Sequence, residues 1–257
     1  MSASPHSLRQ GEAQYDGIAR FYQRTRQSPL RRYVECYTFF GMLGDVAGKT
    51  VLDLACGEGY YTRLLRERGA RRVLGVDVSP AMIELACGQR DGPPEGIEYR
   101  VGDVRDLPAL GAFDLACAAY LLHYARDVAE LGRMCRSIAL QLPPGAPFVA
   151  INENPEQPEE RYRGYLQYGF SKSVAHPRRE GSPITYAMVS GRELFRFEAY
   201  HFERDTYERA LAAAGFTDIR WHPLALDPAG EAAHGAAYWA EYLDNPPVVG
   251  LSCRRAG

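Results

Sequence analysis

The stretch Val51–Tyr61 (VLDLACGEGYY) combines residue types that suit the binding of a nucleotide-like cofactor. An apolar run stops at two glycines, Gly57 and Gly59, and the pattern predicts a helix directly after them, at about 60–68. Glycines let a ligand approach the backbone because they carry no side chain. The start of a helix adds free N–H groups. These residues therefore predict a cofactor site at a junction of strand, glycine turn and helix.

Three acidic residues near this turn bear on which cofactor it binds. Asp53 lies in the first predicted strand, Asp77 ends the second, and Asp103 follows the third. A carboxylate at the position of Asp77 can accept two hydrogen bonds from ribose hydroxyls. The dinucleotide fingerprint G-x-G-x-x-G is incomplete, because Thr62 stands at its third position. A nicotinamide-dependent oxidoreductase is therefore the alternative and not the first choice.

The segments around these acids resemble, in order, the motifs of class I S-adenosylmethionine-dependent methyltransferases. They are Asp53–Gly59, Arg72–Asp77, Gly102–Val104 and Phe113–Tyr120. The resemblance implies S-adenosyl-L-methionine as cofactor, with Met82 against the adenine and Asp103 near the adenine amino group. Asp53 has two interpretations, a carboxylate that holds the turn or one near the amino group of the cofactor. The implied cofactor residues are Tyr15, Asp53, Ala55, Gly57, Gly59, Asp77, Val78, Met82, Gly102, Asp103, Val104 and Ala119.

The N-terminal segment and the end of the fourth strand supply candidates for acceptor binding. Tyr15–Ala19 resembles the lid helix of small-molecule methyltransferases, and the segment 15–102 is similar to toxoflavin-biosynthesis-type N-methyltransferases. The resemblance places the end of strand four toward the transferred methyl, so Tyr120 and His123 are the candidate catalytic residues. The predicted substrate residues are Tyr22, Phe39, Tyr120, His123, Asn152, His176 and Tyr186, with Tyr124, Glu153 and His201 in the wider pool.

An aromatic-rich pocket suits a flat heterocycle or a phenol, although core packing competes as an explanation for each aromatic residue. In-line transfer requires alignment above all. A nitrogen with a free lone pair needs no strong base, whereas a phenol or alcohol does, and His123 is then the first candidate. We therefore rank methylation of nitrogen before oxygen, and oxygen before carbon. A non-catalytic cofactor-binding regulatory protein is a further alternative.

The elements that must position these residues alternate between strand and helix. This rhythm predicts an α/β fold with a doubly wound, mostly parallel seven-stranded sheet. We expect a disordered tail over 1–12, a helical lid over 13–46, and the Rossmann-like domain over 47–257 with an inserted cap at about 155–200. Strands are predicted at 50–55, 72–77, 97–101, 113–119, 146–152, 216–222 and 247–253, a hairpin at 184–200, and helices at 60–68, 80–88, 127–140 and 204–214.

Composition narrows the class of partner. The net charge is -2 and no basic face is evident, which disfavours nucleic acid. No apolar run is long enough to span a bilayer and no signal core is present, so we expect a cytoplasmic monomer or homodimer without membrane contact. The six scattered cysteines form no C-x-x-C pair and are expected to be free thiols. No His, Asp and Glu spacing suggests a metal, which disfavours a metal-dependent catechol enzyme.

Overall fold

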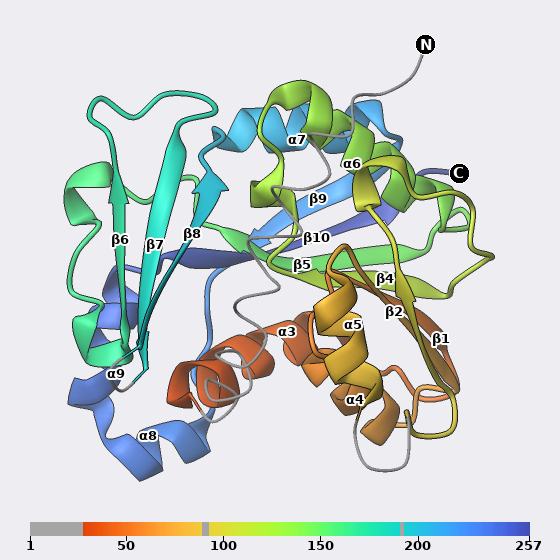
Figure 1. The fold of residues 1–257 in the computed structure, drawn as a ribbon, viewed down its shortest axis with the longest axis horizontal. Helices are drawn as coiled ribbons and strands as arrows, with labels where there is room; N and C mark the ends of the chain where they lie inside the picture. Colours follow the sequence, from red (N-terminus) through yellow and green to blue (C-terminus); the bar gives the residue numbers. More distant parts are fainter. Residues whose placement is uncertain (1–27, 89–92, 191–192) are drawn as a thin grey trace.

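A seven-stranded sheet forms the centre of the computed structural model, which describes residues 28–88, 93–190 and 193–257 (Figure 1). The strand order is β3-β2-β1-β4-β5-β10-β9, and β10 runs antiparallel to both of its neighbours while the other pairs are parallel. The strands are β1 Thr50–Leu54, β2 Arg72–Asp77, β3 Ile97–Val101, β4 Leu115–Ala119, β5 Pro147–Glu153, β9 Phe216–His222 and β10 Val248–Arg255. The predicted doubly wound, mostly parallel sheet is confirmed.

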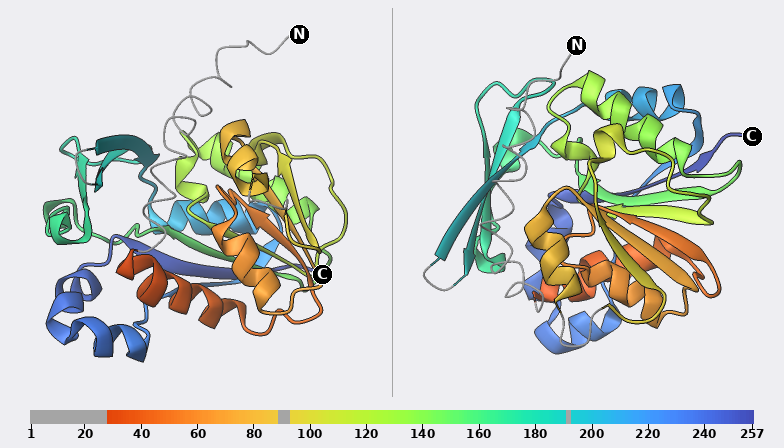
Figure 2. Two further views of the ribbon diagram at one scale, coloured as in Figure 1. Left: turned by 60° about the horizontal axis from the view of Figure 1, so that its bottom comes forward. Right: turned by 45° about the vertical axis from the view of Figure 1, so that its right-hand side comes forward.

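Helices cover both faces of the sheet (Figures 1 and 2). Alternate strand residues point to opposite faces: Val51 packs into a core with α3 and α4, whereas Leu52 and Leu54 pack into a core with α6 and α7. None of the helices in the described ranges is long and apolar enough to cross a membrane. The helices are α3 Cys36–Leu43, α4 Tyr60–Glu67, α5 Pro80–Cys87, α6 Val128–Leu140 and α7 Arg204–Ala213.

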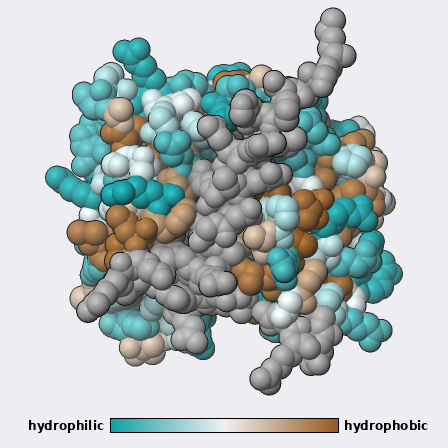
Figure 3. All heavy atoms as spheres, viewed as in Figure 1, coloured by the Kyte–Doolittle hydropathy of each residue, from teal (hydrophilic) through white to brown (hydrophobic). Residues whose placement is uncertain are grey.

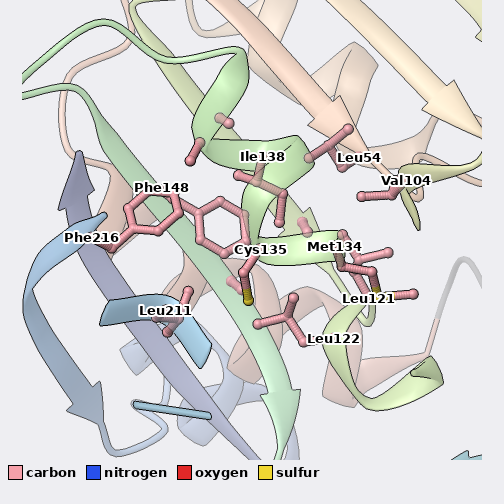
Figure 4. Close-up of a cluster of buried hydrophobic side chains, with 14 of the residues drawn as sticks. Leu54, Val104, Leu121, Leu122, Met134, Cys135, Ile138, Phe148, Leu211 and Phe216 are labelled. Atoms are coloured by element: carbon pink, nitrogen blue, oxygen red, sulfur yellow. The ribbon is translucent and has the colours of Figure 1, made fainter. Parts of the chain in front are cut away.

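The core under α6 reaches the end of the sheet where ligands bind in such folds. Figure 4 shows Leu121 and Met134 side by side within this cluster, on the same side as Val104. These three residues also line the main cavity described below. The hydrophobic core and the floor of the cavity are therefore one packed unit.

A second, three-stranded antiparallel sheet lies between β5 and α7 in the sequence and stands at one side of the main sheet (Figures 1 and 2). We call it the cap sheet; its strands are β6 Phe170–Val174, β7 Pro183–Ser190 and β8 Glu193–Tyr200. The hairpin of β7 and β8 agrees with the predicted one. The prediction omitted β6, and it also omitted α8 Pro228–His234 and α9 Ala236–Asp244, which lie between β9 and β10.

One apolar cluster joins the cap sheet to α9 and to the first described helical turn. It contains Val34, Tyr186, Trp239 and Tyr242. The short helical turns are η1 Arg31–Glu35 (a π-helix), η2 Val104–Asp106, η3 Leu122–Tyr124, η4 Glu159–Arg161 and η5 Leu166–Tyr168. On the face shown in Figure 3, polar side chains dominate the periphery, with smaller apolar patches between them. The predicted tail and residues 13–27 of the predicted lid fall outside the described residues.

The two glycines in the turn after β1 are required for different structural reasons. Gly57 has a φ of +55°, and a Cβ there would meet nothing within 4 Å. Gly59 has a φ of +82°, and a Cβ there would lie 2.7 Å from Cζ of Tyr99. The same ring lies against Gly75, where a Cβ would be 2.8 Å from Cδ1 of Tyr99. Packing against Tyr99 therefore explains Gly59, whereas Gly57 opens onto free space.

We expect Gly59→Ala to destabilise the fold more than Gly145→Ala does. Both positions require a left-handed backbone, which costs about 1–2 kcal/mol for a residue with a side chain. Gly145 has a φ of +80° but open space around it, so only Gly59→Ala must also displace the Tyr99 ring. Urea unfolding of the two variants measures the difference. Equal destabilisation of both variants would show that Tyr99 yields without cost.

Candidate active site

The main cavity lies at the carboxyl edge of the parallel strands and has a volume of about 400 Å³. Ala55 follows β1, Asp77 ends β2, Gly102 follows β3 and Ala119 ends β4, and all four line the cavity. Ligands of doubly wound sheets bind at this edge. The volume is within the range of about 300–1,000 Å³ that is typical of small-molecule sites.

Most of the predicted cofactor residues line this main cavity. Those that do so are Ala55, Gly57, Asp77, Val78, Met82, Gly102, Asp103, Val104 and Ala119. Asp53 and Gly59 do not line it, and Tyr15 lies outside the described residues. The cavity lining also includes residues that the sequence did not indicate, among them Arg31, Arg105 and Met134.

Asp77 holds the glycine turn while its carboxylate faces the cavity. One carboxylate oxygen accepts from the Gly57 amide at 2.8 Å and the other from the Ser79 amide at 2.9 Å. Burial raises the pKa of this carboxyl, and the hydrogen bonds from Ser79 and Gly57 oppose that shift. An ionised carboxylate has about four acceptor sites, so Asp77 retains capacity for ligand hydroxyls.

Asp53 lies outside the lining of the main cavity. The residue is 1% exposed, and its carboxylate accepts a hydrogen bond from Oγ1 of Thr62 at 2.6 Å. Burial raises its pKa to about 7. This carboxylate connects β1 to α4, which agrees with a role in holding the turn. The predicted contacts of Asp53 and Gly59 with the cofactor stay predictions.

A second cavity of about 100 Å³ adjoins the first and shares Arg31, Tyr120 and Tyr124 with it. The cap sheet supplies much of its wall, with Phe170 on β6, Tyr186 and Met188 on β7, and Phe197 on β8. The rings of Tyr186 and Phe197 are stacked with their centroids 5.1 Å apart. Flat aromatic walls of this kind favour a flat ligand through stacking.

Tyr120 lies where the two cavities meet, directly after β4. Its φ of +68° is rare for a residue with a bulky side chain. Its backbone amide donates to the Ile151 carbonyl at 2.9 Å, which holds this conformation in place. Backbone strain of this type costs about 1–3 kcal/mol and gathers at functional sites. The position fits the predicted role of Tyr120 at the site of methyl transfer.

His123 lines the second cavity, and the tautomer of its ring decides whether it has the lone pair that a general base needs. Its Nδ1 lies 3.0 Å from the acceptor Oδ1 of Asn152 and 3.2 Å from the donor backbone amide of Glu153. With the proton on Nδ1, the ring donates to Asn152 and keeps a lone pair on Nε2; with the proton on Nε2, Nδ1 accepts from the Glu153 amide. Burial lowers the pKa of His123 and favours the neutral ring. Each tautomer satisfies one of the two contacts, so the role of His123 as a general base stays a prediction.

Glu153, also on the cavity wall, is neutralised by partners from the cap sheet. Lys172 on β6 forms an ion pair with it and Tyr186 on β7 donates a hydrogen bond to it. The ammonium group of Lys172 also donates to the Gln157 side chain at 2.6 Å. The Lys172 side chain is fully buried, which lowers its pKa to about 8. This network fixes the cap sheet to the end of β5.

Several predicted substrate residues lie outside both cavities. Phe39 is buried in the core under α3, and the Asn152 side chain contacts the ring of His123. His176 is exposed and contacts Glu159 at the surface. Tyr22 lies outside the described residues. The positions of Phe39, Asn152 and His176 give no support to direct contact with an acceptor, whereas Tyr120, His123 and Tyr186 do line the second cavity.

Comparisons with known proteins identify the class. Residues 51–145 match the family described as "Methyltransferase domain". The chain is 30% identical over 186 residues to N-demethylindolmycin N-methyltransferase of Streptomyces griseus, covering 72% of this chain and 76% of that protein. It is also 30% identical to a dTDP-4-amino-2,3,4,6-tetradeoxy-D-glucose N,N-dimethyltransferase of Saccharopolyspora spinosa, covering 65% and 71% of the two chains.

A solved structure agrees with these matches. An S-adenosylmethionine-dependent methyltransferase from Mesorhizobium loti superimposes with a TM-score of 0.62 at 28% identity, covering 86% of this chain and 97% of that one. The fold and the cavity define a Rossmann-like, cofactor-dependent transferase. The chain belongs to the class I S-adenosylmethionine-dependent methyltransferases, and the cofactor is S-adenosylmethionine.

The residues of the main cavity fit this cofactor. The Tyr61 hydroxyl is buried without a hydrogen-bond partner in the described part of the chain, so a polar ligand group would satisfy it. A side chain at Gly57 would enter open space at the cavity, which leaves room for close approach. Asp77 offers acceptors, and Met82 and Leu121 offer apolar surface. Asp103 is held by Arg105, whose Nε lies 2.9 Å from it.

We expect Asp77→Asn to weaken cofactor binding by about 10- to 100-fold, because hydrogen bonds to a charged group contribute about 1.5–3 kcal/mol. Titration calorimetry with S-adenosylhomocysteine measures this change. Asp114→Asn is the matched control, since that carboxylate accepts from the Thr50 amide at 2.7 Å, at the other end of β1 and outside the cavity. Unchanged affinity in Asp77→Asn, or an equal loss in the control, would contradict the assignment.

We expect Lys172→Met to destabilise the protein by about 3–5 kcal/mol, because it leaves Glu153 buried without its cation. The double variant Lys172→Met with Glu153→Gln should regain most of that loss, since no buried charge remains. Lys49→Met is the control, because this half-exposed lysine lies outside the network. Chemical denaturation reports all three values. A double variant as unstable as the single one would refute the coupling between the two charges.

Proposed function

We propose that the protein transfers a methyl group to a nitrogen of a small aromatic or heterocyclic metabolite in specialised biosynthesis. The observation that carries this proposal is the aromatic-walled cavity beneath the cap sheet, which meets the cofactor cavity at Tyr120. Its small volume of about 100 Å³ favours a small acceptor. The relatives named above as N-methyltransferases of small molecules support the choice of nitrogen.

The geometry suits direct in-line displacement. When bound, S-adenosylmethionine supplies a methyl group already activated by its sulfonium. The chain must then hold the acceptor in line with that methyl and exclude water, and such alignment can contribute about 7–11 kcal/mol to lowering the barrier. Stacking on Tyr186 and Phe197 and contact with Tyr120 would orient the acceptor. The cap sheet contributes to the walls of both cavities, because Glu198 and Tyr200 of β8 line the cofactor side.

Nitrogen is favoured over oxygen as the acceptor atom because it requires less of the protein. Phenols and alcohols need a base to remove their proton, whereas a neutral nitrogen attacks with its own lone pair. The contacts of Nδ1 with Asn152 and with the Glu153 amide keep the His123 ring in place on the cavity wall.

Incubation of the purified protein with trideuteromethyl-labelled S-adenosylmethionine and a metabolite extract tests this function. We expect mass spectrometry to detect a labelled product whose fragments carry the label on nitrogen. Asp77→Asn, assayed at limiting cofactor, should form less of the same product. Label on oxygen or carbon would refute N-methylation. Binding of S-adenosylhomocysteine without any labelled product would favour the regulatory alternative.

A further inference from the structure

The second cavity contains an acidic residue that the sequence did not indicate as functional. Glu35 is 8% exposed, and it lines the second cavity but not the cofactor cavity. Its polar neighbours are the hydroxyls of Tyr120 and Tyr61 and the guanidinium of Arg31. Burying an ionised carboxylate is costly, and a cationic ligand would offset part of that cost. Glu153 on the same wall differs, because Lys172 and Tyr186 satisfy it.

The local backbone aims Glu35 into the cavity. Glu35 ends the π-helix η1, and Arg31 begins it. A π-helix has a wider turn than an α-helix, with hydrogen bonds from residue i to i+5, and such turns are frequent at functional sites. Residues four apart then share a face, and both Arg31 and Glu35 line the second cavity. The irregular turn thus presents a buried carboxylate to the second cavity, beside Tyr120.

The groups around Glu35 leave it open to a cationic ligand. Burial raises its pKa, while Arg31 and the nearby hydroxyls of Tyr120 and Tyr61 lower it and favour the ionised form. Arg31 is the charged group acting on Glu35 in the described structure; the others are uncharged at neutral pH because burial raises their pKa values. The titratable groups facing Glu35 are Arg31, Cys36, Tyr60, Tyr61, Tyr120 and Tyr242.

We propose that Glu35 binds the amine of the acceptor and takes its proton, so that the acceptor is a basic amine attached to a flat ring. This inference rests on the proposed N-methylation and names its substrate class. The carboxylate would pair with the ammonium group, and the rings of Tyr120, Tyr124 and Phe197 would surround the cation and its ring.

The chemical step balances with the groups in the site. An ammonium proton passes to the Glu35 carboxylate, which becomes a carboxylic acid, and the amine becomes neutral. The nitrogen lone pair then forms the bond to the methyl carbon, and the electron pair of the sulfur–methyl bond stays on sulfur. The product leaves as a methylammonium ion, and Glu35 returns its proton to solvent. The raised pKa of Glu35 reduces the difference in pKa between the ammonium group that gives the proton and the carboxylate that takes it.

Binding of two matched probes to the full-length protein tests this proposal without any methyl transfer. With saturating S-adenosylhomocysteine, calorimetry compares 2-phenylethylamine with 2-phenylethanol, which has a similar shape but no charge. We expect the wild type to bind the amine about tenfold or more tightly than the alcohol. In Glu35→Gln this preference should fall to within about twofold, with S-adenosylhomocysteine affinity unchanged. Glu67→Gln, at the exposed end of α4, should keep the wild-type preference.

Two further readouts separate ligand binding from a structural role. Glu35→Gln should keep the melting temperature of the wild type, because the amide still accepts from the hydroxyl of Tyr120, whereas loss of a structural carboxylate would lower the melting temperature. The amine preference of the wild type should disappear on acidification at a higher pH than an ordinary carboxyl titrates, which is about 4.3.

Four results would overturn the proposal: equal binding of both probes by the wild type, a preference retained in Glu35→Gln, weakened S-adenosylhomocysteine binding in that variant, or binding of neither probe. Failure of the proposed function itself has a separate signature, since it would show as absent methyl transfer in the labelling experiment.

Discussion

The buried ion pair between Glu153 and Lys172 is the interaction on which the acceptor side of the molecule depends. Glu153 ends β5 of the main sheet, and Lys172 lies on β6 of the cap sheet, so the pair connects the two sheets. Lys172 continues the network to Gln157, which donates to the Asn245 side chain at 2.7 Å just after α9. The backbone amide of Glu153 orients His123. One buried cation therefore fixes the cap sheet, the end of α9 and a ring of the cavity wall together.

The two carboxylates of the second cavity illustrate opposite uses of burial. Glu153 has a cation and a phenol hydroxyl as partners, so it holds the cap sheet in place. Glu35 is also buried, with the hydroxyls of Tyr120 and Tyr61 and the charge of Arg31 beside it, and it faces the second cavity, where a cationic ligand would add a further favourable interaction. The strained Tyr120 between them adds a second local cost at the same place. Free-energy costs from a buried charge and from backbone strain are expected together at a site where ligand binding matters more than maximal stability.

The cofactor side could be predicted from the sequence because its residues lie at the ends of consecutive parallel strands. Asp77, Gly102 and Ala119 each follow a recognisable apolar run, and parallel strands place such ends along one edge. Gly59 has a packing reason that the sequence did not indicate, since a glycine required by a packed aromatic ring looks the same in a sequence as one required by a ligand. Its neighbour Tyr99 is 40 residues away in the chain.

The acceptor side could be predicted only in part. The hairpin of β7 and β8 has strong strand periodicity, whereas β6 is a short strand in a polar stretch and a loop with Pro177 separates it from β7. The helix α8 did have a readable signal, since Asp227 and Pro228 form a typical start and the Asp227 carboxylate accepts from the Ala229 amide at 2.9 Å. Glu35 had none, because a π-turn changes which residues of a helix share a face.

Two insertions that lie far apart in the chain contribute to the wall of the second cavity. The cap sheet enters after β5, and the pair α8 and α9, with Tyr242, enters between β9 and β10. The strand ends that line the main cavity come from β1, β2, β3 and β4, outside both insertions. The walls of the acceptor cavity can therefore change in sequence while the edge of the sheet that lines the donor cavity stays the same.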